Sequence, residues 1–186
     1  MLRSVGKTTG RGGVWTMQPA TEKPNSNVVE LLSEPDAIDF GDLPPHINAL
    51  LQQGVAAYRR DNESADRLFR EALAAAPTEL PVYFCLHKIH TYQGNLDDAE
   101  AAAETGLKEA ARQAGWSAEW RDWQIPQGQT KGAARFAIYT LKALAFIQLR
   151  KDNRLLALEM LAAREQLDPS GSVGWPVVAA IADGLG

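Results

Sequence analysis

One short stretch of the sequence carries side chains that could bind a metal ion. Cys85, His87 and His90 follow one another closely. On a helix, His87 and His90 would face the same side because they are three residues apart, and two imidazoles can share a metal ion. Cys85 would point toward another side, and no third ligand stands nearby in the sequence. Metal binding through His87 and His90 is therefore the minor interpretation, and neutral core histidines are the alternative that we favour.

The sequence contains no other pattern typical of catalysis. Gly6-Lys7-Thr8 matches only the end of a phosphate-binding loop, because Met1 stands where the first glycine of such a loop is required. No serine, histidine and acid occur in a context typical of a hydrolase. We therefore expect a protein that is not an enzyme and has no cofactor.

Composition excludes several other classes of protein. The chain has 186 residues, of which 45% are hydrophobic and 23% charged, with a net charge of −4. This is ordinary for a globular domain, and the acidic balance argues against nucleic-acid binding, which needs a basic face. A single cysteine, Cys85, fits a reducing cytoplasm, and no apolar run is long enough for a membrane-spanning helix.

The chain divides into an N-terminal arm and a helical domain. Residues 1–45 are rich in glycine, proline and polar side chains and predict a flexible arm. Within it, residues 27–32 could form a short helical docking motif. From residue 46 onward, good helix formers dominate, and glycine and proline recur at intervals typical of helix ends. The expected fold class is all-α.

Small residues and prolines recur in the helical domain with a fixed period. Ala65 and Ala99 are one period apart, and Ala157 follows Ala99 by one period plus the length of an insertion at 114–137. Pro77 follows Ala65 at the same distance as Pro169 follows Ala157. A period of about 34 residues in a helix–turn–helix pattern resembles the tetratricopeptide repeat family.

The resemblance covers about residues 47–171 in three copies. The second helix of the first copy matches the family pattern fully, and its residues are Ala65, Phe69, Ala72 and Pro77. The second copy departs from the pattern at His87, His90, Ala103 and Ala111. The copies span residues 47–79, 80–113 and 138–171. The resemblance implies an α-solenoid of about three helical hairpins, which a C-terminal capping helix at residues 173–184 would complete.

The family usually binds peptides on a concave face formed by the first helix of each copy. Aromatic residues interleaved with lysine and arginine on this face would suit an extended peptide with apolar and acidic side chains. The resemblance thus implies a protein-binding adaptor or chaperone, and the small acidic chain is similar to the secretion-associated chaperones of bacteria. The alternative is that these aromatic residues pack against neighbouring helices. The candidate residues are Asn48, Leu51, Val55, Tyr58, Arg59, Phe84, Lys88, Thr91, Tyr92, Tyr139, Lys142, Phe146, Leu149 and Arg150.

The insertion at residues 114–137 is rich in tryptophan. Trp116, Trp120 and Trp123 are spaced by four and three residues and would form one stripe on a helix. We expect this stripe to dock on the repeats, since exposed tryptophan is costly, and a partner-binding hot spot is the alternative. Self-assembly through this insertion or through the apolar C-terminal helix is the alternative function.

Overall fold

The computed structural model describes residues 38–124 and 131–168. All regular secondary structure in these residues is helical, which confirms the all-α fold class for this part of the chain. The chain divides into two compact units, residues 1–34 and 35–186, and every described residue belongs to the second. The expected docking motif at 27–32, most of the N-terminal arm and the capping helix at 173–184 lie outside the described residues.

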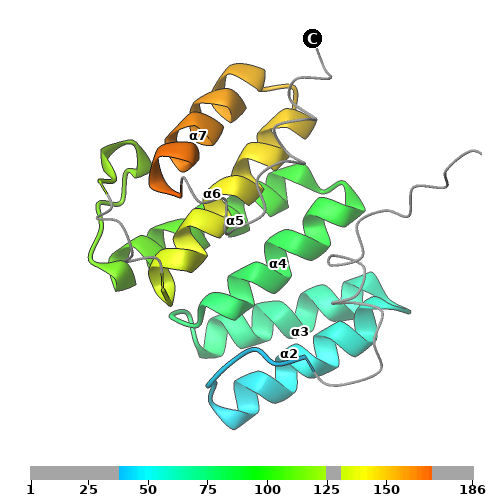
Figure 1. Cartoon of the computed structure of the whole chain (residues 1–186). Helices are drawn as coiled ribbons and strands as arrows, with labels where there is room; N and C mark the ends of the chain where they lie inside the picture. The colour runs from blue at the N-terminus through cyan, green and yellow to red at the C-terminus, as the bar shows by residue number, and fades with distance from the viewer. Residues whose placement is uncertain (1–37, 125–130, 169–186) are drawn as a thin grey trace, which may run out of the picture. The chain divides into compact units, whose positions relative to one another are not determined.

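Six α-helices and one short 3-10 helix make up the described chain. They are α2 (Pro45–Tyr58), α3 (Asn62–Ala75), α4 (Leu80–Gln93), α5 (Leu96–Ala114), η1 (Trp120–Asp122), α6 (Ala133–Arg150) and α7 (Arg154–Leu167). Each α-helix packs against the next one along the chain, and α4 also contacts α2 and α6 (Figure 1). Within the described residues, no helix combines the length and the apolar character needed to span a bilayer.

The turns between helices explain where the helices begin and end. The Asp61 carboxylate accepts hydrogen bonds from the backbone N–H groups of Glu63 and Ser64, which caps the start of α3. Gly94 ends α4 and Gly115 ends α5, each in the left-handed conformation that favours glycine.

The spacing between helices repeats the spacing found in the sequence. Asn62, Leu96 and Arg154 are the first residues of α3, α5 and α7, and each lies three positions before one of the periodic alanines. The fourth residue of each of these helices is therefore an alanine, and none of the three has exposed surface, namely Ala65, Ala99 and Ala157.

Two glycines allow helices to approach closely. A Cβ atom at Gly54 of α2 would lie 2.3 Å from Cε1 of Phe69 on α3. A Cβ atom at Gly106 of α5 would lie 2.7 Å from the Cβ of Tyr83 on α4. Neither place has room for a side chain, so these small residues have a packing role.

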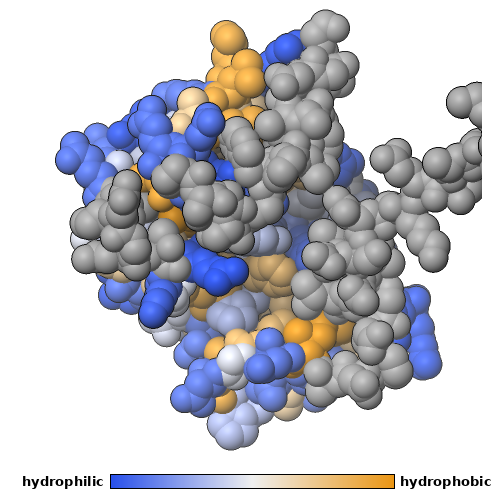
Figure 2. Space-filling view, viewed as in Figure 1, coloured by the Kyte–Doolittle hydropathy of each residue, from blue (hydrophilic) through white to orange (hydrophobic). Residues whose placement is uncertain are grey.

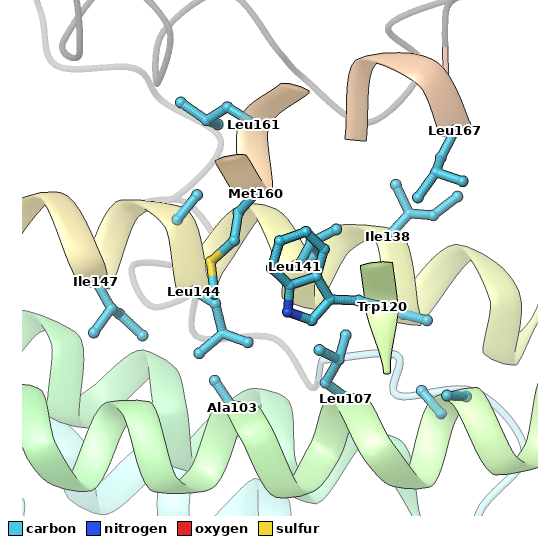
Figure 3. Close-up of a cluster of buried hydrophobic side chains, with 14 of the residues drawn as sticks. Ala103, Leu107, Trp120, Ile138, Leu141, Leu144, Ile147, Met160, Leu161 and Leu167 are labelled. Carbon is cyan, nitrogen blue, oxygen red and sulfur yellow. The ribbon is translucent and has the colours of Figure 1, made fainter. Parts of the chain in front are cut away.

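The buried side chains form two clusters. One lies among α2, α3 and α4 and contains Ile47, Leu51 and Phe69. The other joins α5, α6 and α7, and Figure 3 shows the indole of Trp120 between side chains from all three helices.

The three tryptophans do not share one helix, so the predicted helical stripe is wrong. Gly115 ends α5 before Trp116, and only residues 120–122 form a short 3-10 turn. Trp120 and Trp123 are nevertheless 8% exposed each, and the Trp123 indole N–H donates to the Ser117 carbonyl at 2.7 Å. The ring of Trp116 packs against that of Trp123 with centroids 5.0 Å apart. These contacts support the docking interpretation over an exposed hot spot.

Residues just before α2 also contact the helical domain. The side-chain amide of Gln52 donates to the Ile38 carbonyl at 2.6 Å and accepts from the Ile38 N–H at 3.1 Å. Phe40 and Leu43 pack against the cluster that contains Leu51. The packed part of the chain therefore begins before residue 45, where the flexible arm was expected to end.

Candidate functional site

Aromatic side chains of α4 and α6 meet in one cluster. The ring centroids of Phe84 and Tyr139 are 5.5 Å apart, and the His87 ring lies edge-on to Phe84 at 5.6 Å. His87 and Tyr139 are 6.4 Å apart. The edge-on arrangement of Phe84 and His87 is a favourable one for aromatic rings. The cluster therefore fixes the position of α6 against α4.

A lysine side chain lies over this cluster. The Lys88 Nζ atom is 4.7 Å from the centroid of the Phe84 ring, which is a cation–π contact. Lys88 is only 8% exposed, and burial lowers the pKa of its ammonium group. A cation that has lost much of its water has less hydration to give up when an anionic group approaches it.

Three tyrosines extend the cluster across α2, α4 and α6. Tyr92 is 44% exposed, and its pKa is raised to about 12 by partial burial and by the nearby phenols of Tyr139 and Tyr58. Tyr92 of α4 is therefore within electrostatic reach of one phenol from α2 and one from α6. We call the surface of Tyr58, Phe84, Lys88, Tyr92 and Tyr139 the tyrosine face. Figure 2 shows apolar and hydrophilic side chains mixed at the surface over α4.

A polar connection lies beside the tyrosine face and joins the last turns of α4 and α6. The Arg150 guanidinium donates to the Thr91 carbonyl, and the Thr91 hydroxyl donates to the His87 carbonyl at 2.6 Å. Arg150 therefore holds α6 against α4 in addition to presenting a charge.

Other residues predicted for the binding face lie elsewhere. Leu51 has no exposed surface and belongs to the cluster of α2, α3 and α4, so its predicted contact with a partner is wrong. The reason is that α2 packs this side against α3 and against Phe40 and Leu43. Leu149 is 7% exposed and is likewise a core residue.

The remaining predicted residues are half-buried or exposed side chains on or next to α2 and α6. The Asn48 side-chain carbonyl accepts a hydrogen bond from Gln52, and Val55 packs partly against the same cluster as Leu51. Arg59 is exposed immediately after α2, Lys142 is half-buried, and Phe146 packs partly against the cluster of α5, α6 and α7.

The two histidines considered for metal binding face different helices. His90 Nε2 lies 2.9 Å from an Asp66 carboxylate oxygen of α3, whereas the His87 ring contacts Tyr139 of α6. Burial, with the Lys88 ammonium nearby, lowers the pKa of His87 to about 3. The described residues contain no group of three or more histidine, cysteine or acidic side chains placed to hold a metal ion. The site geometry therefore offers no support for a shared metal at His87 and His90.

Sequence reasoning missed one contributor to this site and one contact outside it. His87 was expected in the core, but its ring also forms part of the aromatic cluster under Lys88. The spacing of Phe84, His87 and Lys88, at i, i+3 and i+4 on one helix, was the available signal. The contacts of residues 38–43 with α2 had no comparable signal, because that stretch has no helical periodicity.

Comparison with known proteins identifies no relative. No family model matches the chain, and neither a curated protein nor a solved structure is significantly similar to it.

Proposed function

We propose that the helical pairs α2–α3, α4–α5 and α6–α7 are three tetratricopeptide-like repeats stacked as a short solenoid. The repeated spacing of the first residues of α3, α5 and α7 supports this arrangement. The contacts of α4 with both α2 and α6 also support it, because the first helices of successive repeats are neighbours in such a solenoid.

The protein is proposed to bind a segment of another protein on the tyrosine face, as a non-catalytic adaptor or chaperone. The observation that carries this proposal is the exposed Tyr92 within electrostatic reach of the Tyr58 and Tyr139 phenols, together with the Lys88 ammonium over the Phe84 ring, which packs against Tyr139. Aromatic side chains with a polar end are typical of binding hot spots. The desolvated lysine adds a preference for an acidic group, so the expected ligand is an extended peptide with apolar and acidic side chains.

The chain's other features fit this function. The net charge of −4 disfavours nucleic acid as the partner. The buried, unpaired Cys85 is compatible with a reducing compartment such as the cytoplasm.

A peptide array tests the proposal. Short peptides that combine leucine or isoleucine with aspartate or glutamate would be printed beside matched peptides in which lysine replaces the acids. The protein is expected to bind members of the acidic set only. Tyr92→Ala should weaken that binding about tenfold, or ~1.4 kcal/mol. No binding to either set, or full binding by the Tyr92→Ala variant, would contradict the proposal.

A further inference from the structure

Residues 38–43, which we call the internal segment, lead into α2 (blue in Figure 1) and are held on that helix through their main chain. The Gln52 side-chain amide donates to the Ile38 carbonyl at 2.6 Å, and its oxygen accepts from the Ile38 N–H at 3.1 Å. Paired backbone contacts of this kind join antiparallel strands and also bind extended peptides to proteins. Both bonds use backbone atoms of residue 38, so any residue except proline can form them. Gln52 therefore recognises a main chain rather than a particular side chain.

The side of α2 that holds the internal segment is the side predicted to bind peptides. The Gln52 amide also donates to the Asn48 side-chain oxygen at 3.2 Å, which orients it. Asn48, Gln52 and Val55 are spaced by four and three residues and so share one side of the helix. Asn48 and Val55 are two of the residues that the repeat resemblance assigned to the peptide-binding face. The chain's own segment thus lies on a surface expected for a partner.

The side chains of the internal segment have the composition proposed for that partner. Phe40 and Leu43 pack against the cluster of α2, α3 and α4, whereas Asp39 and Asp42 are exposed. The segment thus combines packed apolar side chains with acids at the surface, and it has no basic residue. An extended peptide with apolar and acidic side chains is the ligand expected for the tyrosine face.

The internal segment lies over the core rather than within it. Each of its residues is half-buried or exposed, whereas Ile47 and Leu51 of α2 have no exposed surface. Its turn at Gly41 has a φ of 83°, and a Cβ atom there would meet nothing within 4 Å. The described contacts that attach it are the main-chain bonds to Gln52 and its partly buried apolar side chains. A peptide of similar composition is able to replace these contacts.

A partner on the tyrosine face meets the internal segment when it continues along α2. Tyr58, the last residue of α2, belongs to the tyrosine face. Gln52 lies about 9 Å before Tyr58 along the helix axis, at about 1.5 Å per residue. An extended peptide spans that distance with about three residues, at about 3.3 Å each. A peptide that runs from Tyr58 toward the start of α2 therefore reaches the place of Ile38 on Gln52.

We propose that the internal segment is a ligand of its own chain, which an extended peptide partner displaces from α2. The partner pairs its main chain with Gln52 and places apolar side chains where Phe40 and Leu43 lie. This role rests on the proposed function, because the partner reaches α2 from the tyrosine face. A segment on a short tether acts at an effective concentration on the order of millimolar, so even modest docking lowers the affinity for a competing peptide severalfold. The internal segment is thus an autoinhibitory contact.

Exchange between the internal segment and a free copy of it tests this role in the full chain. The probe is a peptide with the sequence of residues 38–43, amidated at its end and acetylated so that its first residue keeps an amide N–H. NMR titration with the probe up to millimolar concentration gives its dissociation constant. The side-chain amide signals of Gln52, identified by their absence in Gln52→Leu, show whether the probe binds at that residue.

Two pairs of variants weaken the internal segment or leave it intact. Phe40→Ser removes a packed side chain, and Asp42→Ala is its matched control, since the Asp42 side chain is exposed. Ile38→Pro and Ile38→Ala form a second pair that leaves Phe40 in place. Both lose the isoleucine side chain, but only proline loses the N–H that Gln52 accepts. Circular dichroism checks that each variant keeps its helices.

The probe should bind Phe40→Ser severalfold more tightly than the wild type or Asp42→Ala, and Ile38→Pro severalfold more tightly than Ile38→Ala. It should shift the Gln52 side-chain signals, and adding Gln52→Leu to Phe40→Ser should weaken its binding severalfold. Equal affinities within both pairs, or no binding to any variant, would overturn the proposed role. Unchanged binding after the addition of Gln52→Leu would overturn it too, because the main chain would then be held elsewhere.

The acidic array peptides separate this role from the proposed function. An array peptide that binds the wild type should bind Phe40→Ser severalfold more tightly. Equal binding to both would overturn displacement by a partner and leave the tyrosine face as a site. Absence of array-peptide binding to every variant would contradict the proposed function, and the probe would then decide alone whether the internal segment is exchangeable.

Discussion

Gly54 of α2 and the Phe69 ring of α3 are packed so closely that one methyl group would not fit between them. A Cβ atom at Gly54 would lie 2.3 Å from Phe69 Cε1. The first helical pair therefore depends on the absence of a side chain at position 54.

Gly54→Ala should destabilise the protein although alanine is the better helix former. The overlap with Phe69 should cost about 1–3 kcal/mol, and the gain in helix propensity offsets about 1 kcal/mol of it. Chemical denaturation measures the net loss. Adding Phe69→Leu should reduce the cost of Gly54→Ala, because the smaller side chain makes room. Equal effects of Gly54→Ala in the two backgrounds would mean that the contact with Phe69 is not the cause.

Gly94 and Asp152 occupy equivalent turns, after α4 and α6. We expect substitutions at these two positions to change the stability of the fold in opposite directions. Both have left-handed backbone conformations, with φ of 81° at Gly94 and 64° at Asp152. Gly94→Ala should cost about 1 kcal/mol, because a Cβ atom is disfavoured in that conformation. Asp152→Gly should stabilise the fold by a few tenths to about 1 kcal/mol for the same reason. Thermal melting shows whether each variant is more or less stable than the wild type. A loss of stability in Asp152→Gly would contradict this account of the turn.

Burial of His87 predicts a loss of stability in acid. The folded-state pKa is lowered to about 3, whereas the unfolded chain takes up this proton near pH 6.5. As the pH falls below about 6.5, only the unfolded state gains the proton, so its free energy falls relative to the folded state. Between about pH 7.5 and about pH 4.5 this effect should remove about 2–3 kcal/mol from the free energy of unfolding.

Replacing His87 tests this pH dependence. His87→Met should make the free energy of unfolding less sensitive to acid by that amount, as measured by urea denaturation at the two pH values. His46→Gln, at an exposed histidine of α2, is the control variant for the loss of a histidine. An unchanged pH dependence in His87→Met would assign the acid sensitivity to other groups.

The Arg164–Asp168 ion pair near the end of α7 predicts a large effect of removing one charge. The Arg164 guanidinium lies 3.2 Å from an Asp168 carboxylate oxygen, and these side chains are 1% and 3% exposed. Asp168→Asn should cost about 3 kcal/mol, because the arginine charge stays buried. Glu159→Gln is the matched control, since the Glu159–Arg121 pair is about half exposed and its loss should cost much less. Similar costs for the two variants in denaturation experiments would contradict this reasoning.

The spacing of small residues predicted several buried positions of the helices. Ala65, Ala99 and Ala157 recur at the repeat spacing and all three are fully buried, because only small side chains fit where paired helices cross. Arg164 departs from this rule. It occupies the position equivalent to Ala72 and Gly106, and its charge is accommodated there by Asp168 one turn later.

The site was less predictable than the helices. The sequence placed Phe84, Tyr92 and Tyr139 on one face, but it could not separate these residues from Leu51, which the same helical register also selects. Part of the difference arises from Phe40 and Leu43, which pack against the cluster that contains Leu51 and come from a stretch without periodicity. The tryptophan spacing was misleading for a similar reason, since Gly115 ends α5 before the first of the three.

The affinity of the tyrosine face for an acidic peptide is the most direct test of the proposed function. Fluorescence polarisation would measure the affinity of one acidic array peptide for the wild-type chain, for Lys88→Gln and for Lys108→Gln. Lys108 is exposed on α5. We predict that Lys88→Gln weakens binding about tenfold, or ~1.4 kcal/mol, while Lys108→Gln binds like the wild type. Equal affinities of the two variants would contradict the assignment of this face as the binding site.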